Sequence, residues 1–128
     1  MKIIRSSKLP FVPASHEDPQ NPQVVKKVLF TYQDLITGRI QMINWTKLPA
    51  AYKSRAHYHE DMQEIFILIS GQATMAVNNE IEVLQAGDGI IVPIKHVHTM
   101  ENIGAQDVEY LVIGISTGTN GKTVTLEP

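Results

Sequence analysis

The segment HYHEDMQEIFILI spans residues 57–69, with polar, histidine-bearing residues at its start and a nearly continuous apolar run at its end. If its start is extended, His57 and His59 point to the same side, because side chains alternate along a strand. Glu64 follows five residues after His59, and two imidazoles with a nearby carboxylate suit a divalent transition metal. The apolar run is short and rich in branched residues, which favours a strand buried on both faces over a helix.

Short strand-like segments follow one another at regular spacing through the rest of the chain. Besides 64–69, they are predicted at 24–32, 39–45, 72–77, 80–85, 90–93, 98–102 and 108–116. Asn78-Asn79 predicts a two-residue hairpin, because asparagine tolerates the positive φ that such turns require. No helix longer than a turn or two is indicated. This pattern predicts an all-β, antiparallel sandwich or barrel.

The composition predicts one domain with polar segments at both ends. A chain of 128 residues is long enough to bury a real core, which we assign to residues 24–116. Residues 1–23 hold four prolines and predict an extended N-terminal arm, since proline cannot donate to a strand ladder. Residues 117–128 are polar and glycine-bearing and predict a C-terminal tail.

Charge and cysteine content exclude several classes of function. The formal net charge of -2 gives no electrostatic reason to expect binding to nucleic acid or to an anionic membrane. The absence of cysteine excludes disulfides, thiolate metal sites and cysteine nucleophiles. No secretory signal and no apolar run of membrane-spanning length is visible, so the expected location is the cytoplasm.

Two motifs in this sequence resemble those of the cupin superfamily. His57-x-His59-x4-Glu64-x6-Gly71 matches the first cupin motif, and Gly87-x5-Pro93-x4-His98-x3-Asn102 matches the second. The segment between them, residues 72–86, has the short length typical of small single-domain cupins. The chain therefore resembles a monocupin over roughly residues 40–116. The resemblance implies an antiparallel jelly-roll β-barrel with a metal ion inside.

The cupin motifs also imply the metal ligands. Carried over to this sequence, they are His57, His59, Glu64 and His98. Three neutral imidazoles and one carboxylate would leave one or two coordination positions open to water or substrate. This donor set suits one divalent ion of Mn, Fe, Ni, Co, Zn or Cu. The chain departs from the motifs at Ala51 and Lys95, where glycine is usual, and neither position is a ligand.

Lys95, His96 and Gln63 are the candidates for catalytic acid–base roles beside the ligands. Lys95 is expected near the mouth of the cavity. His96 follows Pro93 in a turn and is interpreted as solvated or as a partner of a ligand. Gln63 is most simply part of a solvated turn, with a hydrogen bond near the metal as the alternative. His16 is interpreted as an exposed loop residue, unless the N-terminal arm folds over the barrel mouth.

Three classes of function stay open. The chain could be a small metalloenzyme of dioxygenase, isomerase or lyase type acting on a small organic substrate, and we favour this class. It could instead be a non-catalytic module that binds a small molecule or metal, or a protein with a structural metal; the fold alone does not decide. A homodimer is expected, because small cupins commonly dimerise and the apolar face of Ile65, Ile67 and Ile69 needs covering.

Overall fold

The computed structural model describes residues 1–118 and 122–126, so residues 119–121 and 127–128 of the predicted tail lie outside the described residues. The described residues form strands and one short 3-10 helix, η1 (Ser6–Lys8). The strands are β1 (Lys2–Ile4), β2 (Val12–Pro13), β3 (Val25–Lys26), β4 (Arg39–Leu48), β5 (Tyr52–Lys53), β6 (His57–His59), β7 (Met62–Ser70), β8 (Gln72–Val77), β9 (Glu80–Gln85), β10 (Gly89–Val92), β11 (His98–Asn102), β12 (Val108–Ser116) and β13 (Thr123–Thr125). No helix among the described residues is long and apolar enough to cross a membrane.

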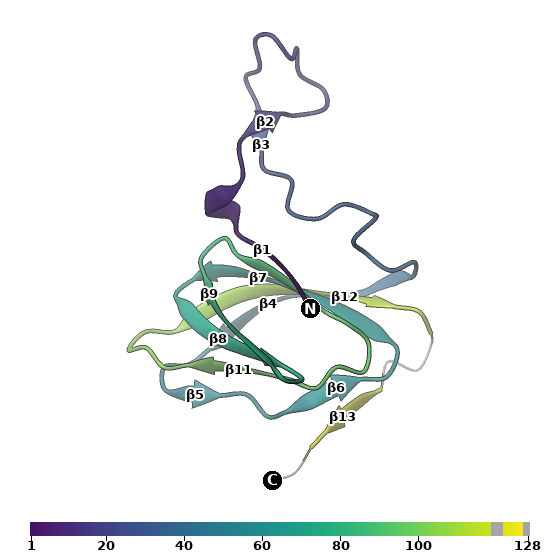
Figure 1. The fold of residues 1–128 in the computed structure, drawn as a ribbon, viewed down its shortest axis with the longest axis vertical. Helices are drawn as coiled ribbons and strands as arrows, with labels where there is room; N and C mark the ends of the chain where they lie inside the picture. The colour runs from purple at the N-terminus through teal and green to yellow at the C-terminus, as the bar shows by residue number, and fades with distance from the viewer. Residues whose placement is uncertain (119–121, 127–128) are drawn as a thin grey trace.

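Two antiparallel sheets face each other and enclose the core (Figure 1). The five-stranded sheet has the order β1-β10-β7-β12-β4. The six-stranded sheet has the order β13-β6-β11-β8-β9, with β5 added beside β11. Neighbouring strands in both sheets are antiparallel. This arrangement confirms the predicted all-β antiparallel fold and matches a jelly roll.

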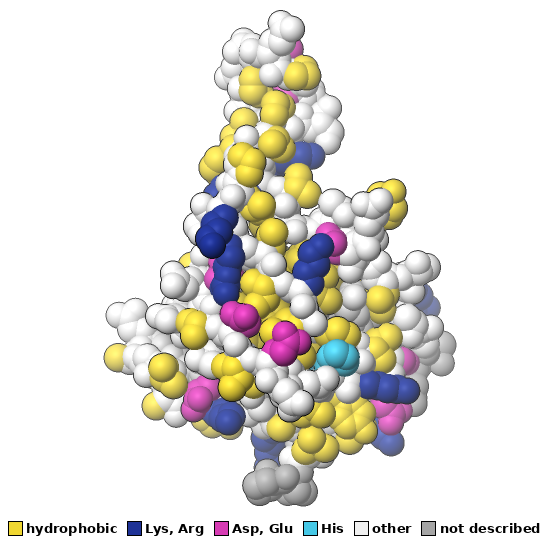
Figure 2. All heavy atoms as spheres, in the orientation of Figure 1, with side chains coloured by type: hydrophobic (Ala, Val, Ile, Leu, Met, Phe, Trp, Pro, Cys, Tyr) yellow, Lys and Arg dark blue, Asp and Glu magenta, His cyan; other side chains and the backbone are white. Residues whose placement is uncertain are grey.

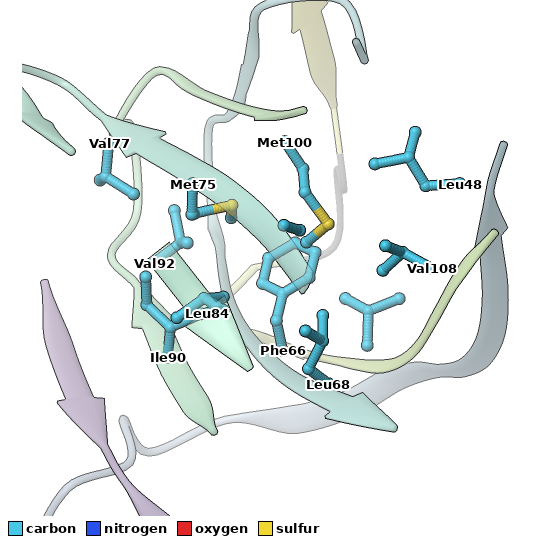
Figure 3. Packing of buried hydrophobic residues seen from close by; sticks show 12 residues of the cluster. Leu48, Phe66, Leu68, Met75, Val77, Leu84, Ile90, Val92, Met100 and Val108 are labelled. Carbon is cyan, nitrogen blue, oxygen red and sulfur yellow. The ribbon is translucent and has the colours of Figure 1, made fainter. Parts of the chain in front are cut away.

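The interior between the sheets is filled by apolar side chains from both of them (Figure 3). Phe66 and Leu68 of β7 point inward, as their parity with Glu64 predicts, and Leu68 is almost completely buried. Met75 and Leu84 meet them from β8 and β9. Burial of this apolar surface is the main source of stability, so the ends of the interior are the places left for polar chemistry.

The outer face of the five-stranded sheet is also apolar. The strand register places Ile91, Ile65, Ile113 and Ile43 side by side across four neighbouring strands. The chain after β3 crosses part of this face, where Phe30, Leu35 and Ile36 pack on Ile65, Ile91 and Ile115. Ile43 is left 61% exposed. The intramolecular cover is therefore partial.

The strand predicted at 24–32 is wrong beyond Lys26. Only Val25 and Lys26 form a ladder, and their partner is the two-residue strand β2. From there the chain turns toward the barrel, where Phe30 packs into the outer apolar cluster. The alternating pattern over 24–32 thus reflects the packing of individual side chains. Beyond Lys26 this segment has no neighbouring strand among the described residues with which its backbone could pair.

Several turns have the chemistry that the sequence indicates. The Asn78-Asn79 hairpin joins β8 and β9, and Asn78 adopts a φ of 51°. The two departures from the cupin motifs also adopt positive φ, with 60° at Ala51 and 65° at Lys95. Only glycine takes this conformation without a steric penalty, which explains why glycine is usual at both positions. The backbone turn is kept here in spite of the larger residues.

Candidate metal centre

Four polar side chains converge at one end of the interior, and they come from both sheets. His57 and His59 lie on β6, and His98 is the first residue of β11. β6 pairs with β11 so that His98 lies directly opposite His57. Glu64 lies on β7 of the facing sheet. The folding of the two sheets against each other therefore assembles the group, and neither sheet contains it alone.

The potential ligand atoms of these four residues all lie within 4.8 Å of one another. The Oε1 atom of Glu64 is 2.9 Å from Nε2 of His59 and 3.0 Å from Nε2 of His98. The ring centroids of His57 and His98 are 4.3 Å apart. His59, Glu64 and His98 are buried, whereas His57 is half-buried. The group is thus compact, and solvent approaches it on the side of His57.

Backbone carbonyls hold the outward nitrogens of two of the histidines. Nδ1 of His57 lies 2.8 Å from the carbonyl oxygen of Arg55, and Nδ1 of His98 lies 3.0 Å from that of His96. Because a carbonyl oxygen can only accept, Nδ1 carries the proton in both rings. The neutral rings therefore present an unprotonated Nε2, and the histidine ligands of metal sites are commonly oriented in this way.

His59 is oriented by a side chain rather than by the backbone. Its Nδ1 lies 3.0 Å from the hydroxyl oxygen of Thr123. Thr123 belongs to β13, which pairs with β6 so that Thr123 is directly opposite His59 (Figure 1). A hydroxyl can accept the Nδ1 proton, and Nε2 of His59 then faces Glu64 as a free acceptor.

Three buried atoms at this site have no hydrogen bond of acceptable geometry: Nε2 of His59, Nε2 of His98 and Oε1 of Glu64. Their separations are as short as hydrogen bonds, yet with Nδ1 protonated all three atoms are acceptors that face one another. Buried polar atoms without partners cost about 1–3 kcal/mol each. A cation among them would satisfy all three atoms, so the residues present fit a divalent metal ion.

The surroundings keep the donors in the protonation states that metal binding needs. Burial lowers the pKa of His57 below its usual 6.5, which favours the neutral ring. Burial alone would raise the pKa of the Glu64 carboxyl, but hydrogen bonds from His59 and His98, which these rings donate when Nε2 carries a proton, outweigh it and lower the pKa to about 2. Glu64 is therefore ionised at any pH near neutrality.

The predicted catalytic candidates lie at different places around this group. The side chain of Lys95 is exposed, while its backbone N–H donates to the carbonyl of His59 over 2.9 Å. His96 contributes its carbonyl to the orientation of His98. Gln63 is buried on the opposite face of β7, where its Oε1 accepts a hydrogen bond from Ile36, so the structure does not bring it to the group.

His16 lies far from the four clustered residues. It is exposed in the loop between β2 and β3, which projects from the barrel (Figure 1), and its ring is 3.7 Å from the carboxylate of Glu17. The alternative in which the arm brings His16 over the barrel mouth does not occur in this structure.

Sequence reasoning missed two residues near the site. Thr123 was part of a segment with no visible strand signal, and only the pairing of β13 with β6 reveals it. Tyr110 is half-buried, and its ring lies 5.6 Å from Phe66, which in turn lies 5.9 Å from the ring of His98. Burial and the nearby charge of Glu64 raise the pKa of the Tyr110 hydroxyl, so it stays protonated. Tyr110 shares one face of its strand with Val108 and Val112, and this shared face was the feature of the sequence that indicated an inward direction.

Comparisons with known proteins identify the family and the fold. The family model described as "Cupin domain" matches residues 44–114, which is more than half of the chain. An uncharacterised protein of Methanocaldococcus jannaschii, MJ1618, is 26% identical over 99% of this chain and 98% of its own length. Its similarity along the full length adds no information about activity.

Two solved structures resemble the barrel. The plu4264 protein of Photorhabdus luminescens is 29% identical with a TM-score of 0.56, over 59% of this chain and 62% of that one. The oxalate decarboxylase of Bacillus subtilis, described as having Mn(II) centres, is 27% identical with a TM-score of 0.59. That match covers 66% of this chain but only 23% of the enzyme, so the chain corresponds to a small part of its length. Together with the matched family model, the two motifs and the four clustered residues, these similarities establish that the chain belongs to the cupin family.

Proposed function

We propose that this cupin is a small metalloenzyme that binds one divalent transition metal ion through His57, His59, Glu64 and His98 and converts a small organic substrate there. The proposal rests on one observation above all. Oε1 of Glu64 lies within 3.0 Å of Nε2 of His59 and of Nε2 of His98, none of these buried atoms has a hydrogen-bonding partner, and a cation would satisfy all three.

The metal, when bound, would supply Lewis acidity or redox chemistry to an oxygen-bearing substrate group. Glu64 and the three imidazoles leave one or two positions for that group. Access is from the side of half-buried His57, because the interior beyond the site is packed with Phe66 and its apolar neighbours. The substrate must therefore be small.

Tyr110 is the group of this chain that we assign to proton transfer or substrate positioning. Its hydroxyl remains protonated at neutral pH, since burial and the charge of Glu64 raise its pKa. A protonated phenol can donate a hydrogen bond to a substrate oxygen or deliver a proton to a carbanion or leaving group. Lys95 is close to His98 in the sequence, and its side chain is exposed. It would therefore contribute positive charge at the rim of the site and would not act as a buried acid.

Among dioxygenase, isomerase and lyase chemistries, we favour a lyase acting on a small carboxylic acid. The support is similarity to a part of oxalate decarboxylase, together with a protonated tyrosine suited to donating a proton. A carboxylate substrate would also match the positive charge of the loaded site. The packed apolar interior favours the alternative, a non-catalytic module that binds metal or a small anion.

Metal analysis and turnover together test this proposal. Purified protein loaded with Mn(II) or Fe(II) should hold about one ion per chain, and His59→Ala should lose most of it. The loaded protein is then incubated with a panel of small carboxylic acids while carbon dioxide release and oxygen uptake are recorded. Turnover that Tyr110→Phe lowers at unchanged metal content supports the enzyme. Binding of the acids without turnover supports the non-catalytic module, and wild-type protein without metal refutes both.

A further inference from the structure

A glycine lies inside a central strand of the sheet that carries Glu64. Gly114 belongs to β12, which pairs with β7 on one side and with β4 on the other. The strand register places Gly114 directly opposite Glu64 on β7 and opposite Met42 on β4. Glycine weakens the interior of a strand, and where it occurs it often marks a bulge or the close approach of another group. Its position beside a candidate metal ligand therefore calls for a functional explanation.

The strand pairing is irregular at the same point. The register between β12 and β4 shifts between Gly114 and Ile115. The pairing of β12 with β7 runs without a shift past Glu64, from Tyr110 to Ser116. Irregularities of this kind re-aim side chains and are over-represented next to active sites. The irregularity here lies on the β4 side of Gly114, where Met42 is.

Two methionine side chains occupy the space that a larger residue at position 114 would fill. A Cβ atom added to Gly114 would overlap Sδ of Met62 and would lie 3.1 Å from Cε of Met42. Met62 precedes Glu64 by two residues on β7, so the two side chains share one face of the strand. Met62 is buried, yet it belongs to neither apolar core cluster of the described residues. Its thioether thus lies across Gly114, beside Glu64.

Met42 is the more adaptable of the two methionines. It lies on β4, the edge strand of the five-stranded sheet, so a neighbouring strand flanks it on one side only. Its side chain is half-buried, and its Sδ atom lies 3.6 Å from the Nδ2 atom of Asn44, which is a weak contact. Methionine is unbranched and flexible and fills irregular spaces. Met42 can therefore move aside for a small apolar group while the strands stay in place.

The other neighbours of Glu64 on its own sheet are apolar. Val92 lies directly opposite Glu64 on β10. Phe66 follows two residues later on β7, and Val112 of β12 lies opposite Phe66. All three of these apolar side chains are buried. None of these immediate neighbours could pair with a second charged group of a substrate bound at Glu64.

Surface charge offers no comparable means of selecting a substrate. On the face of the molecule shown in Figure 2, basic and acidic side chains lie next to one another instead of forming separate patches. The formal net charge is -2, which does not attract anions at long range. Discrimination among small acids is therefore expected from the walls next to the ligands.

We propose that Met42 and Met62, lying over Gly114, form the wall that determines substrate specificity, and that the substrate is a small carboxylic acid with a short apolar substituent. The inference rests on the proposed function and adds the substrate class to it. The carboxylate binds at the open positions beside the four ligands. The substituent lies over Gly114 against the two thioethers. A polar substituent would lose its hydration there without gaining a hydrogen-bonding partner.

Binding of matched acids to Mn(II)-loaded protein tests the apolar wall. Glycolate, lactate and 2-hydroxybutanoate share one metal-binding group and differ only in the substituent, and glycerate carries a hydroxyl in place of the last methyl of 2-hydroxybutanoate. Water-proton relaxation reports the displacement of water from Mn(II) and requires no turnover. Each carbon added between glycolate and 2-hydroxybutanoate should tighten binding about fourfold. Glycerate should bind at least about fivefold more weakly than 2-hydroxybutanoate.

The possible outcomes separate this inference from the proposed function. The expected order of affinities without turnover of any acid supports the wall and removes the enzyme. Equal binding of the four acids overturns the wall and leaves the metal site in place. Mn(II)-loaded protein that binds none of the four acids overturns both.

Two substitutions should change the preference in opposite directions. Gly114→Ala should weaken 2-hydroxybutanoate about tenfold by crowding Met62, and should leave glycolate within about twofold of wild type. Met42→Ala should bind the longer 2-hydroxyhexanoate about tenfold more tightly than wild type does, because it opens space for two more carbons. Gly104→Ala is the matched control, since Gly104 is exposed in the loop between β11 and β12, and it should change neither preference.

Mn(II) content and thermal unfolding show that each variant is folded and loaded. Should Gly114→Ala fail to fold, Met42→Ala still decides the question, because Met42 lies on an edge strand and is half-buried. A Met42→Ala protein with the wild-type preference for chain length overturns the proposal.

Discussion

Replacing Thr123 with valine should weaken metal binding without unfolding the protein. The two side chains have nearly the same shape, so Thr123→Val keeps the β-branched character of β13 and removes only the hydroxyl that lies 3.0 Å from Nδ1 of His59. In wild-type protein this contact keeps the proton on Nδ1 and leaves Nε2 free for the metal. Without it, His59 can move the proton to Nε2 and bond the Glu64 oxygen 2.9 Å away.

The expected loss of metal affinity follows from the competition between metal binding and this proton switch. A loaded site in the variant leaves a buried Nδ1–H without a partner, which costs about 1–3 kcal/mol. The metal-free site avoids this cost through the switched proton. Affinity should therefore fall about 10- to 100-fold, the range seen when outer partners of metal ligands are removed. The unfolding free energy of the metal-free protein should change by less than about 1 kcal/mol.

Competition with a chelating indicator at pH 7 measures this effect for Zn(II) and Mn(II). Thr125→Val is the matched control, because Thr125 lies on the same strand opposite His57, whose Nδ1 is already held by the carbonyl of Arg55. The control should bind metal as wild type does. If Thr123→Val keeps wild-type affinity, or if both variants lose affinity equally, the assignment of Thr123 as the orienting partner of His59 is refuted.

Three further predictions address charge, packing and metal removal. In metal-free protein, a proton on Nε2 of His59 or His98 replaces the repulsion by a hydrogen bond to Glu64 and lowers the pKa of this carboxyl to about 2, so the fold should lose stability as the pH falls from 4.5 toward 2; Glu64→Gln should abolish this pH dependence in urea titrations. Leu68→Ala should lower the free energy of unfolding by about 2–5 kcal/mol in the same titrations, because Leu68 is almost fully buried between the sheets. Chelation should lower the thermal unfolding temperature of metal-loaded protein, because metal at a hundredfold excess over its dissociation constant adds about 2.7 kcal/mol to the free energy of unfolding. An unchanged unfolding temperature in calorimetry would argue against a metal site in the folded state.

The barrel and the four clustered residues were predictable because their signals are local and repeated. The parity of His57 and His59 holds in β6, and the apolar run after Glu64 is the central strand β7. Motif spacing then placed His98 opposite them. These predictions depend on alternation along single strands and on turns with restricted φ, and both properties are encoded within a few neighbouring residues.

The outer partners of the site could not be predicted in the same way. Thr123 reaches His59 only through pairing between strands that are 64 residues apart, and a three-residue polar strand has no pattern of its own. The position of Gln63 was ambiguous because the sequence does not fix where the turn before β7 ends, so Gln63 could lie in a solvated turn or in the strand, where it faces away from Glu64. The segment 24–32 shows the opposite failure, since alternation was present but no neighbouring strand was available.

The same acceptor atoms that make the site suitable for a metal make it unfavourable without one. With neutral rings protonated at Nδ1, His59, His98 and Glu64 bring three acceptors together in the buried end of the barrel, away from bulk solvent. A fold selected only for stability would place apolar or hydrogen-bonded side chains there, as it does around Leu68 a short distance along β7. Because Glu64 comes from one sheet and the histidines come from the other, the repulsion acts directly across the packed interface. A bound cation would convert that repulsion into a link between the sheets, so variants of these residues that no longer bind metal should lose the stability that the metal adds to the loaded protein.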